Sequence, residues 1–321
     1  MMKGFTLIEL LAVVVILSII LVITIPQINQ VINNSKLSVF ESNASLILDK
    51  ISIYEISDKD IASINETNIE EKLEVDSDNF KSVEVTKKDN KYFITIIGKN
   101  KWDGLFVSGT KNDLEASKIP NSLIAYWNFN GNANDLSGNN YNGTISNQLL
   151  TDGIFGKCYE FNDSTNGINT TFNGTEYSNI SFSIWANYKS TDENMRYIFD
   201  NSPGGRGYIL RYSVNTLFFY KYNEGQPDIT TSITNSPERN KWLNITITKD
   251  LQNLRMYING VLIGERSDTT MITSSTRTLY IGSDIDNIMK FIGLIDNFQI
   301  YNKALAQSEV IRIYNGKLPL E

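Results

Sequence analysis

The sequence contains no histidine and only one cysteine, Cys158, among its 321 residues. A single cysteine cannot form an internal disulfide. Without histidine, the chain can form neither a Ser-His-Asp triad nor a Cys-His pair, and it cannot hold zinc through imidazole ligands. The chemistry that remains is that of carboxylates, either in an acid–base mechanism or as oxygen ligands of calcium.

Basic residues are also few. The chain has 29 Lys and Arg against 36 Asp and Glu, which gives a formal net charge of −7. No basic run is present that would neutralise a series of phosphates, and this argues against nucleic acid as a partner. The length predicts two domains with accessory segments.

A long apolar run lies at the N-terminus. From Leu10 to Ile25 the only polar side chains are Ser18 and Thr24. The 21 residues from Phe5 to Ile25 would span roughly 31 Å as a helix. Because the hydrocarbon core of a bilayer is about 30 Å thick, this segment is long enough to cross a membrane.

The charged residues in and before this run indicate its orientation in a membrane and the free-energy cost of inserting it. Lys3 is the only basic residue before it, so the positive-inside tendency places the N-terminus in the cytoplasm and the rest outside. Glu9 lies within the run, and a charge at mid-membrane costs about 2.5–3.5 kcal/mol. The alternatives are a cleaved secretory signal peptide and a simple anchor with an incidental glutamate. The length of the run, the lack of a small-x-small cleavage site and Glu9 argue against a signal peptide.

Residues 3–11, KGFTLIELL, resemble the signal sequence of type IV prepilins and pseudopilins. In that family a prepilin peptidase cuts after the glycine and methylates the new terminal amine. The resemblance therefore implies a leader at residues 1–4, cleavage between Gly4 and Phe5, and a transmembrane segment at residues 5–25 that later enters the core of a filament.

The resemblance also implies a partner for Glu9. Its carboxylate would pair with the Phe5 amine of a neighbouring pilin subunit, which neutralises two buried charges. Removing one partner of a buried pair costs about 3–5 kcal/mol. We interpret the pair as a check on subunit register during assembly.

The residues after Pro26 change from wholly apolar to amphipathic. Apolar side chains then recur at spacings of four and three, at Phe40, Ala44, Ile47, Ile51 and Tyr54, which predicts one helical face. A helix over 5–57 would be roughly 80 Å long. Its apolar face requires a covering sheet.

Alternating apolar residues within 58–108 predict a small antiparallel sheet, as in a reduced pilin head. Residues 109–120 are polar and end in Pro120, and they are expected to form a linker.

Residues 121–321 contain many short strand-like runs without long helices between them, which predicts an all-β sandwich. Asn259 and Gly260 between two such runs predict a two-residue type I′ hairpin. The region from Leu123 to Asn315 resembles laminin-G-like, concanavalin A-like jelly-roll domains. The segments that carry the resemblance are 124–129, 134–140, 156–162, 181–186, 255–260 and 293–305. The fold class is thus an α+β pilin module followed by a jelly-roll sandwich.

The jelly-roll resemblance implies a structural calcium ion near the Asp-x-Ser-Gly-Asn loop and the final strand. Asp135, Asn140 and Asp296 are the candidate ligands, since calcium prefers six to eight oxygen ligands. The alternative is that Asp135 and Asp296 only accept hydrogen bonds from turn amides.

Domains of this fold frequently bind glycans, and exposed aromatic rings stack on sugars. Phe218, Phe219, Tyr220 and Tyr222 are close in sequence, so strand alternation must point some of them outward. Phe218 or Tyr220 is the candidate platform, depending on register.

These features favour a minor type IV pilin that carries an adhesive, lectin-like domain, possibly at the tip of the filament. The expected partners are other pilins, prepilin peptidase, the membrane before assembly, and a glycan or host surface protein outside the cell. The alternative is a structural, assembly-initiating pilin or a pseudopilin whose sandwich makes protein–protein contacts. An enzyme is not expected, because no pair of carboxylates can be identified.

The Glu9→Ala variant tests the pairing hypothesis. We expect it to be processed normally but to be almost absent from sheared filaments, because the neighbouring Phe5 amine would be buried without a counter-charge. Immunoblots of filament and membrane fractions measure this. Normal incorporation would contradict the hypothesis.

Overall fold

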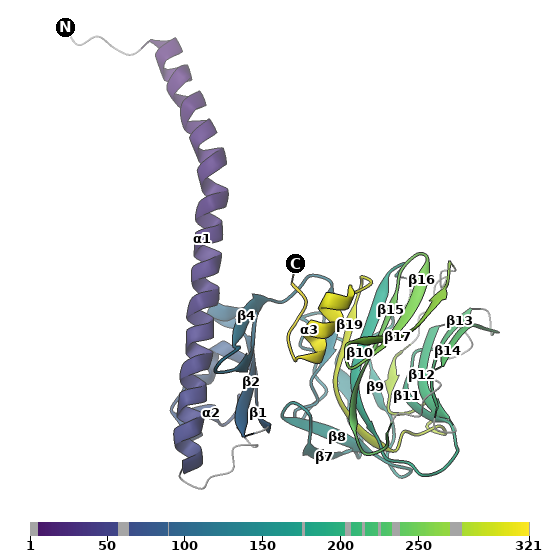
Figure 1. Cartoon of the computed structure of the whole chain (residues 1–321). Helices are drawn as coiled ribbons and strands as arrows, with labels where there is room; N and C mark the ends of the chain where they lie inside the picture. Colours follow the sequence, from purple (N-terminus) through teal and green to yellow (C-terminus); the bar gives the residue numbers. More distant parts are fainter. Residues whose placement is uncertain are drawn as a thin grey trace.

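The computed structural model describes residues 6–56, 64–88, 90–174, 177–202, 207–213, 216–223, 226–232, 238–269 and 278–320. The molecule has a long helix on one side, a small sheet beside this helix, and a β-sandwich on the other side (Figure 1). This arrangement confirms the predicted fold class.

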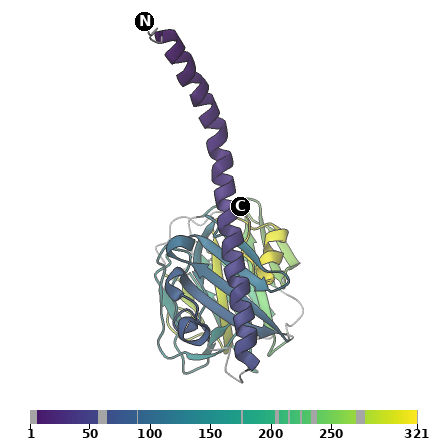
Figure 2. The ribbon, with the colours of Figure 1, turned by 90° about the vertical axis from the view of Figure 1, so that its left-hand side faces the viewer.

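Helix α1 runs from Leu7 to Ile56 as one continuous element and includes Pro26. It is the only helix in the described part of the chain that is long and apolar enough to cross a membrane. Its first half extends away from the rest of the protein, and its second half lies across the small sheet (Figure 2). The predicted apolar face is buried there, with Phe40, Ala44 and Ile51 fully inaccessible to solvent.

The head sheet has four antiparallel strands in the order β1 (Phe80–Lys88), β2 (Lys91–Gly98), β3 (Leu105–Thr110) and β4 (Glu115–Lys118). A short helix, α2 (Ile69–Leu73), precedes it. The face of the sheet toward α1 carries alternating apolar residues, so helix and sheet bury a common core of the kind that period-two patterning predicts. The residues that the sheet contributes to this core include Val83, Val85, Ile94, Ile96 and Val107.

The predicted linker at 109–120 is wrong in its middle part, because Glu115–Lys118 forms β4 and pairs with β3. The physical reason is that apolar and polar side chains alternate over these residues. Leu114 and Ala116 pack against the head core, while Glu115 between them reaches toward the sandwich. Four residues are too few for this alternation to stand out in a polar stretch.

The sandwich consists of two antiparallel sheets. The larger sheet has the order β17-β16-β15-β10-β19-β8-β7, and β5 also pairs with β19. The smaller sheet has the order β14-β13-β12-β11-β18-β9-β6. The strands are β5 (Leu123–Trp127), β6 (Gly143–Thr144), β7 (Leu149–Asp152), β8 (Lys157–Phe161), β9 (Ile168–Thr170), β10 (Ile180–Tyr188), β11 (Arg196–Asp200), β12 (Gly207–Ser213), β13 (Thr216–Asn223), β14 (Gln226–Ser232), β15 (Trp242–Lys249), β16 (Asn253–Ile258), β17 (Val261–Ser267), β18 (Tyr280–Ile281) and β19 (Gly293–Tyr301).

Stacked aromatic rings fill the space between the two sheets. Phe182 on β10 lies 5.2 Å from the ring of Phe199 on β11, and Phe199 lies 5.1 Å from Phe298 on β19. Trp127 packs on Phe298 and donates its indole hydrogen to the Tyr141 carbonyl. These rings supply apolar burial in place of disulfides, which the single cysteine cannot provide.

The hairpin between β16 and β17 follows the prediction from its sequence. Asn259 and Gly260 both have positive φ, 50° and 81°, and they connect strands that end at Ile258 and begin at Val261. Two consecutive positive φ angles are the requirement of a type I′ turn, which asparagine and glycine satisfy at low cost.

The head and the sandwich share a third core cluster. Ile97 and Phe106 of the head pack with Tyr126 and Tyr301 of the sandwich and with the closing helix α3 (Gln307–Tyr314). Arg312 of α3 reaches back to Glu115 of β4 at 2.6 Å. The two domains are therefore packed against each other, with α3 between them (Figure 1).

Two buried carboxyl groups lie at this junction. Glu84 on β1 accepts a hydrogen bond from Asn128, and Asp296 on β19 accepts hydrogen bonds from the amides of Ile154 and Phe155 at 2.9 and 3.2 Å. Burial raises the pKa of Asp296 to about 8. Burial also raises the pKa of Glu84, and the neighbouring Asp296 carboxyl raises it further.

These shifts predict that the protein loses stability as the pH rises. Asp296 is protonated in the folded state up to about pH 8, whereas its unfolded pKa is about 3.9. The unfolded state therefore binds fewer protons between these values, and the free energy of unfolding falls by up to about 1.4 kcal/mol per pH unit from this group. The contribution of Asp296 to the free energy of unfolding is fully present below its pKa in the unfolded state, and it is lost above its pKa in the folded state.

We expect Asp296→Asn to flatten this pH dependence between pH 5 and 8, as measured by urea unfolding. Asp103→Asn is the matched control, because Asp103 is exposed. An unchanged slope in Asp296→Asn would contradict the assignment.

Candidate functional site

The residues predicted for processing and assembly lie at the start of the chain. Gly4 and Phe5 fall outside the described residues. Glu9 lies in the first turn of α1, and its carboxylate accepts hydrogen bonds from the amide and the hydroxyl of Thr6, both at 2.8 Å. In the single chain this carboxylate is exposed, so its pairing with a neighbouring amine stays a prediction.

Asp135 organises the loop that follows β5. One of its carboxylate oxygens accepts from the amides of Tyr126 and Ser137 at 3.0 and 2.9 Å. The other oxygen accepts from the hydroxyl of Ser137 and the amide of Tyr141 at 2.9 and 3.0 Å. A carboxylate offers about four acceptor positions, and all four are used here. Asp135 therefore has the turn-stabilising role that was the alternative to metal binding.

The other two candidate calcium ligands differ from Asp135 in their surroundings. Asn140 is exposed, has a φ of 62°, and its carbonyl accepts from the hydroxyl of Thr171. Asp296 is fully buried at the junction and uses its oxygens on Ile154, Phe155 and Asn297. The hydrogen-bond partners of Asp135 are Tyr126, Ser137 and Tyr141, whereas those of Asp296 are Ile154, Phe155 and Asn297.

Within the described ranges, no three His, Cys, Asp or Glu side chains cluster in a way that could hold a metal ion. Asparagine and carbonyl oxygens are not among these groups, so the calcium site at Asp135, Asn140 and Asp296 stays a prediction.

Phe218 and Tyr220 point outward from β13. The alternate residues Leu217, Phe219 and Lys221 are buried in the sandwich, as the period of two requires. The rings of Phe218 and Tyr220 stack with a centroid distance of 5.8 Å and an interplanar angle of 26°. Both predicted platform residues therefore lie on the outer face of the smaller sheet.

An arginine lies among these rings. Arg211 on β12 pairs with Phe218, and its guanidinium carbon lies 4.5 Å from the ring centroid of Tyr220. The same carbon is 6.0 Å from Phe218 and 5.7 Å from Tyr197 on β11. Its Nη2 donates to the hydroxyl of Tyr220 at 2.9 Å. We call the set of Tyr197, Arg211, Phe218 and Tyr220 the aromatic–arginine surface.

Sequence reasoning missed Tyr197 and Arg211. They come from two other strands, and only the pairing of Tyr197 with Arg211 and of Arg211 with Phe218 brings them beside the predicted rings. The period of two shows which residues of one strand share a face of the sheet. It does not give the register between neighbouring strands, so it cannot show that Tyr197 and Arg211 lie beside the rings of β13.

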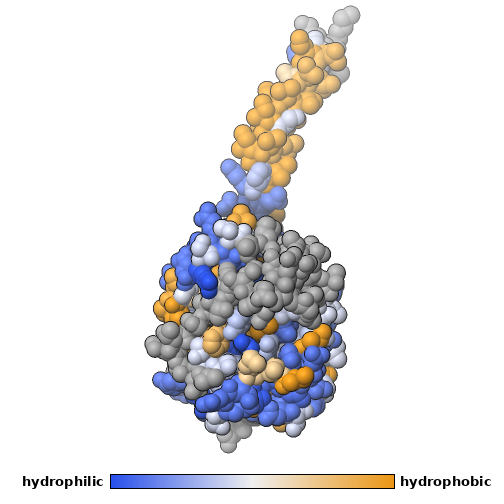
Figure 3. All heavy atoms as spheres, turned by 90° about the vertical axis from the view of Figure 1, so that its right-hand side faces the viewer, coloured by the Kyte–Doolittle hydropathy of each residue, from blue (hydrophilic) through white to orange (hydrophobic). Residues whose placement is uncertain are grey.

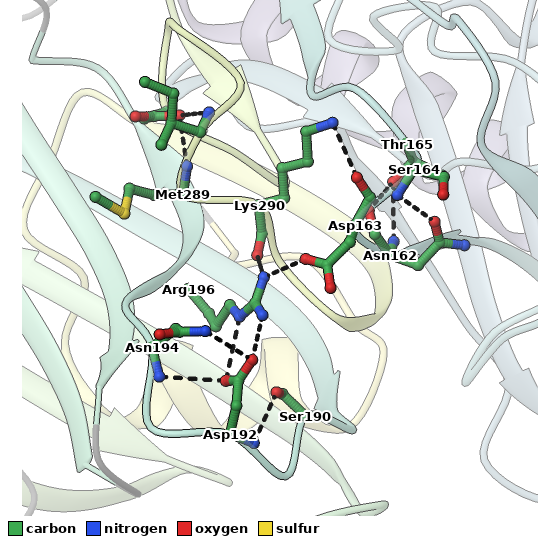
Figure 4. A network of polar contacts seen from close by, with 12 residues as sticks. Asn162, Asp163, Ser164, Thr165, Ser190, Asp192, Asn194, Arg196, Met289 and Lys290 are labelled. Atoms are coloured by element: carbon green, nitrogen blue, oxygen red, sulfur yellow. Dashed lines mark hydrogen bonds and ion pairs between the residues drawn. The ribbon is translucent and has the colours of Figure 1, made fainter.

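A buried arginine fixes the strand that carries Tyr197. Arg196 donates to the carboxylates of Asp163 and Asp192 and, at 3.1 Å, to the carbonyl of Lys290 (Figure 4). These partners come from three separate loops. Since charge-assisted hydrogen bonds are the stronger kind, Arg196 ties the loops to the beginning of β11 and so positions the aromatic–arginine surface.

The outer face of the smaller sheet is on the side of the molecule opposite α1. Figure 3 views this side and shows hydrophilic and hydrophobic residues intermixed on the sandwich, with the apolar part of α1 projecting beyond it. The surface is thus remote from the helix that would enter a membrane or a filament.

Comparison with known families agrees with both halves of the chain. Residues 1–25 match the prokaryotic N-terminal methylation motif, and residues 162–311 match the concanavalin A-like lectin/glucanases superfamily. The chain joins a type IV pilin signal to a concanavalin A-like domain. The predicted family resemblances are therefore confirmed at both ends of this pilin-like chain.

Individual relatives match part of the chain. Paraclostridial mosquitocidal protein 1 from Paraclostridium bifermentans is 29% identical over 206 residues, 57% of this chain and 16% of that protein. Usherin from Homo sapiens is 26% identical over 110 residues, 32% of this chain and 2% of that protein. The pilin-like chain thus spans a small part of these relatives.

Solved structures share the fold. The binding domain of Paraclostridial Mosquitocidal Protein 1 superposes with a TM-score of 0.52 at 22% identity, covering 62% of this chain and 53% of that one. The receptor binding domain of botulinum neurotoxin D gives 0.53 at 21% identity, covering 62% and 54%. At this identity the likeness establishes the sandwich fold alone.

The role of Asp135 predicts the effect of its replacement. In Asp135→Ala, three backbone amides and one hydroxyl lose their acceptor, and each buried unsatisfied group costs about 1–3 kcal/mol. We expect a fall of several degrees in the melting temperature, measured by calorimetry with and without a chelator. Because the lone pairs of Asp135 are already used, wild-type protein should melt at the same temperature in both buffers. A chelator-dependent fall in wild type would instead support the calcium prediction.

Proposed function

We propose that this protein is a minor type IV pilin that displays a lectin-like recognition domain on the filament. The observation that carries the proposal is the joining of two modules on opposite sides of one molecule. The methylation motif and the apolar half of α1 form one end, and the aromatic–arginine surface lies on the far face of the sandwich. A subunit built in this way fixes one side in the filament and presents the other to the surroundings.

The chemistry of the aromatic–arginine surface favours a sugar ligand. The stacked rings of Phe218 and Tyr220 offer an apolar platform, and the guanidinium of Arg211 offers planar donors. Guanidinium groups recognise carboxylates with two parallel hydrogen bonds, so a sugar that bears a carboxylate fits this combination better than a neutral one.

The size of the sandwich supports a minor position in the filament, sparse or at its tip. The sandwich exceeds the head sheet in number of strands and projects to the side of it, which would obstruct the dense packing of identical copies (Figure 1). As a prepilin the chain would be anchored in the cytoplasmic membrane, and after processing it would be part of an extracellular pilus.

The proposal is of a binding protein and not of a glucanase. A glycosidase needs two accessible carboxyl groups about 5–10 Å apart. In the described part of the chain, the carboxyl pair formed by Glu84 and Asp296 is buried at the domain junction and cannot reach a polysaccharide.

Binding to a glycan array tests the proposal. The protein from residue 27 onward is suitable, because the apolar segment before it contacts nothing else in the described chain. We expect binding to carboxylate-bearing glycans, and a loss of about tenfold in affinity for Arg211→Ala or Tyr220→Ala, which corresponds to about 1.4 kcal/mol.

Leu262→Ala is the matched control, since Leu262 is an exposed side chain on β17 of the other sheet and should not affect binding. No binding to any glycan, or equal binding by all variants, would contradict the proposed recognition role of this surface.

A further inference from the structure

A buried pair of opposite charges lies between the two sheets of the sandwich. Lys221 is on β13 of the smaller sheet, and Asp268 directly follows β17 of the larger sheet. Their side chains are only 0% and 1% exposed. The Nζ of Lys221 lies 2.8 Å from one carboxylate oxygen of Asp268 and 2.9 Å from the other. The pair thus connects the two sheets at a place that is closed to solvent.

These distances bring the two halves of an amide bond together. Because Nζ is nearly equidistant from both oxygens, the carboxyl carbon between them lies within about 3.5 Å of it, which is the separation of reacting atoms in a near-attack geometry. An amine and a carboxyl group need no further reactant to form an amide. Since the sheets hold both groups in place, the entropy of bringing them together is lost during folding and not in the reaction.

Burial favours an amide over the ion pair. In water, hydration stabilises free ammonium and carboxylate groups far more than a neutral amide. Folding has already removed this hydration from Lys221 and Asp268, and mutual attraction replaces it only in part. Tyr208, the cross-strand partner of Lys221, is also buried and helps to exclude water that would hydrolyse an amide. Forming the amide removes both charges from the interior.

A second lysine lies beside the same carboxylate. The Nζ of Lys249 is 3.7 Å from one oxygen of the Asp268 carboxylate, and it donates a hydrogen bond to the Asp268 main-chain carbonyl at 3.0 Å. Attack on the carboxyl carbon moves negative charge onto its oxygens, and a fixed positive charge beside them stabilises that state. Lys249 also donates to the main-chain carbonyl of Asp250, so backbone contacts hold it in this position.

We propose that Lys221 and Asp268 become joined by an intramolecular amide bond. A proton first passes from the Lys221 ammonium to one carboxylate oxygen, through the hydrogen bond between them. The Nζ lone pair then forms the N–C bond, and the electrons of the C=O bond move onto the other oxygen, which lies beside Lys249. When the C=O bond forms again, the bond from carbon to the protonated oxygen breaks. That hydroxyl group leaves with a proton from the nitrogen, as water.

The amide links the two sheets covalently. It closes a loop between residues 47 positions apart, and this loop contains β14, β15, β16 and β17. A crosslink of this kind constrains the unfolded chain as a disulfide does. The single cysteine of this chain cannot supply such a link. The inference concerns the sandwich alone and does not depend on the proposed function.

Mass spectrometry of the full chain, purified in detergent, tests the bond. After digestion, wild type should give one branched peptide that contains both Lys221 and Asp268, and its fragmentation should place the junction at these two residues. Lys221→Met keeps a long side chain but lacks the amine, so it should give two separate peptides. After correction for the substitution, the intact wild-type chain should be lighter than this variant by one water molecule.

Lys189→Met is the matched control. Lys189 pairs with Glu160 at 3.1 Å, but these side chains are 35% and 34% exposed, so the pair stays ionic and its loss should leave the branched peptide unchanged. On a denaturing gel, wild type and Lys189→Met should migrate ahead of Lys221→Met, because a closed loop makes the denatured chain more compact.

A wild-type chain that yields only separate peptides of full mass would overturn the proposal and leave an ordinary ion pair. Loss of water without a branched peptide would overturn it as well, because a cyclic imide formed at Asp268 alone has the same mass. The wild-type digest decides between these outcomes even if Lys221→Met fails to fold.

Discussion

The apolar surface of α1 is the constraint on which the rest of this protein depends. Every side chain from Leu7 to Val22 is exposed in the single chain. Each square ångström of apolar surface left in water costs about 25 cal/mol, so this half of the helix is stable only in a bilayer or among other helices. Glu9 adds a second requirement, because its charge is tolerable in such surroundings only with a partner. These properties of the helix fit a chain that lies first in a membrane and then in an assembly of helices, as the proposed function requires.

The domain junction fixes the sandwich relative to α1, which the proposed display of the sandwich requires. Phe93 of the head packs on Phe155 of the sandwich at 5.1 Å, and Glu115 joins Arg312 and Lys317. Together with the shared core around Phe106, these contacts couple the position of α1 to that of the sandwich. A flexible linker would let the sandwich turn freely, whereas a packed junction keeps its outer face directed away from the helix.

Much of this architecture can be predicted from the sequence, where a short pattern has one physical meaning. The apolar run with Glu9, the helical face containing Phe40 and Ala44, and the Asn259–Gly260 turn are local signals that tertiary contacts do not change. Strand alternation likewise predicts that Phe218 or Tyr220 faces outward, and the structure places both outward.

The remaining features depend on register and long-range pairing. Lys221 lies on the buried face of β13. Its charge is tolerated there because Asp268, 47 residues later in the sequence, accepts two hydrogen bonds from its amine. Nothing local in the sequence indicates that a lysine is buried there. Arg211 joins the predicted rings for the same kind of reason. Asp296 is buried with Ile154, Phe155 and Asn297 as its partners, and the first two of these are more than a hundred residues away in the sequence. The strand β4 was missed because it is short and polar.

The central claim is that the N-terminal segment is processed as a pilin and delivers the sandwich to the filament. Intact-mass measurement of the protein from sheared filaments tests this most directly. The account predicts a chain that begins at Phe5 and carries one additional methyl group on its terminal amine. A chain that retains Met1, or that begins after Ile25, would contradict it.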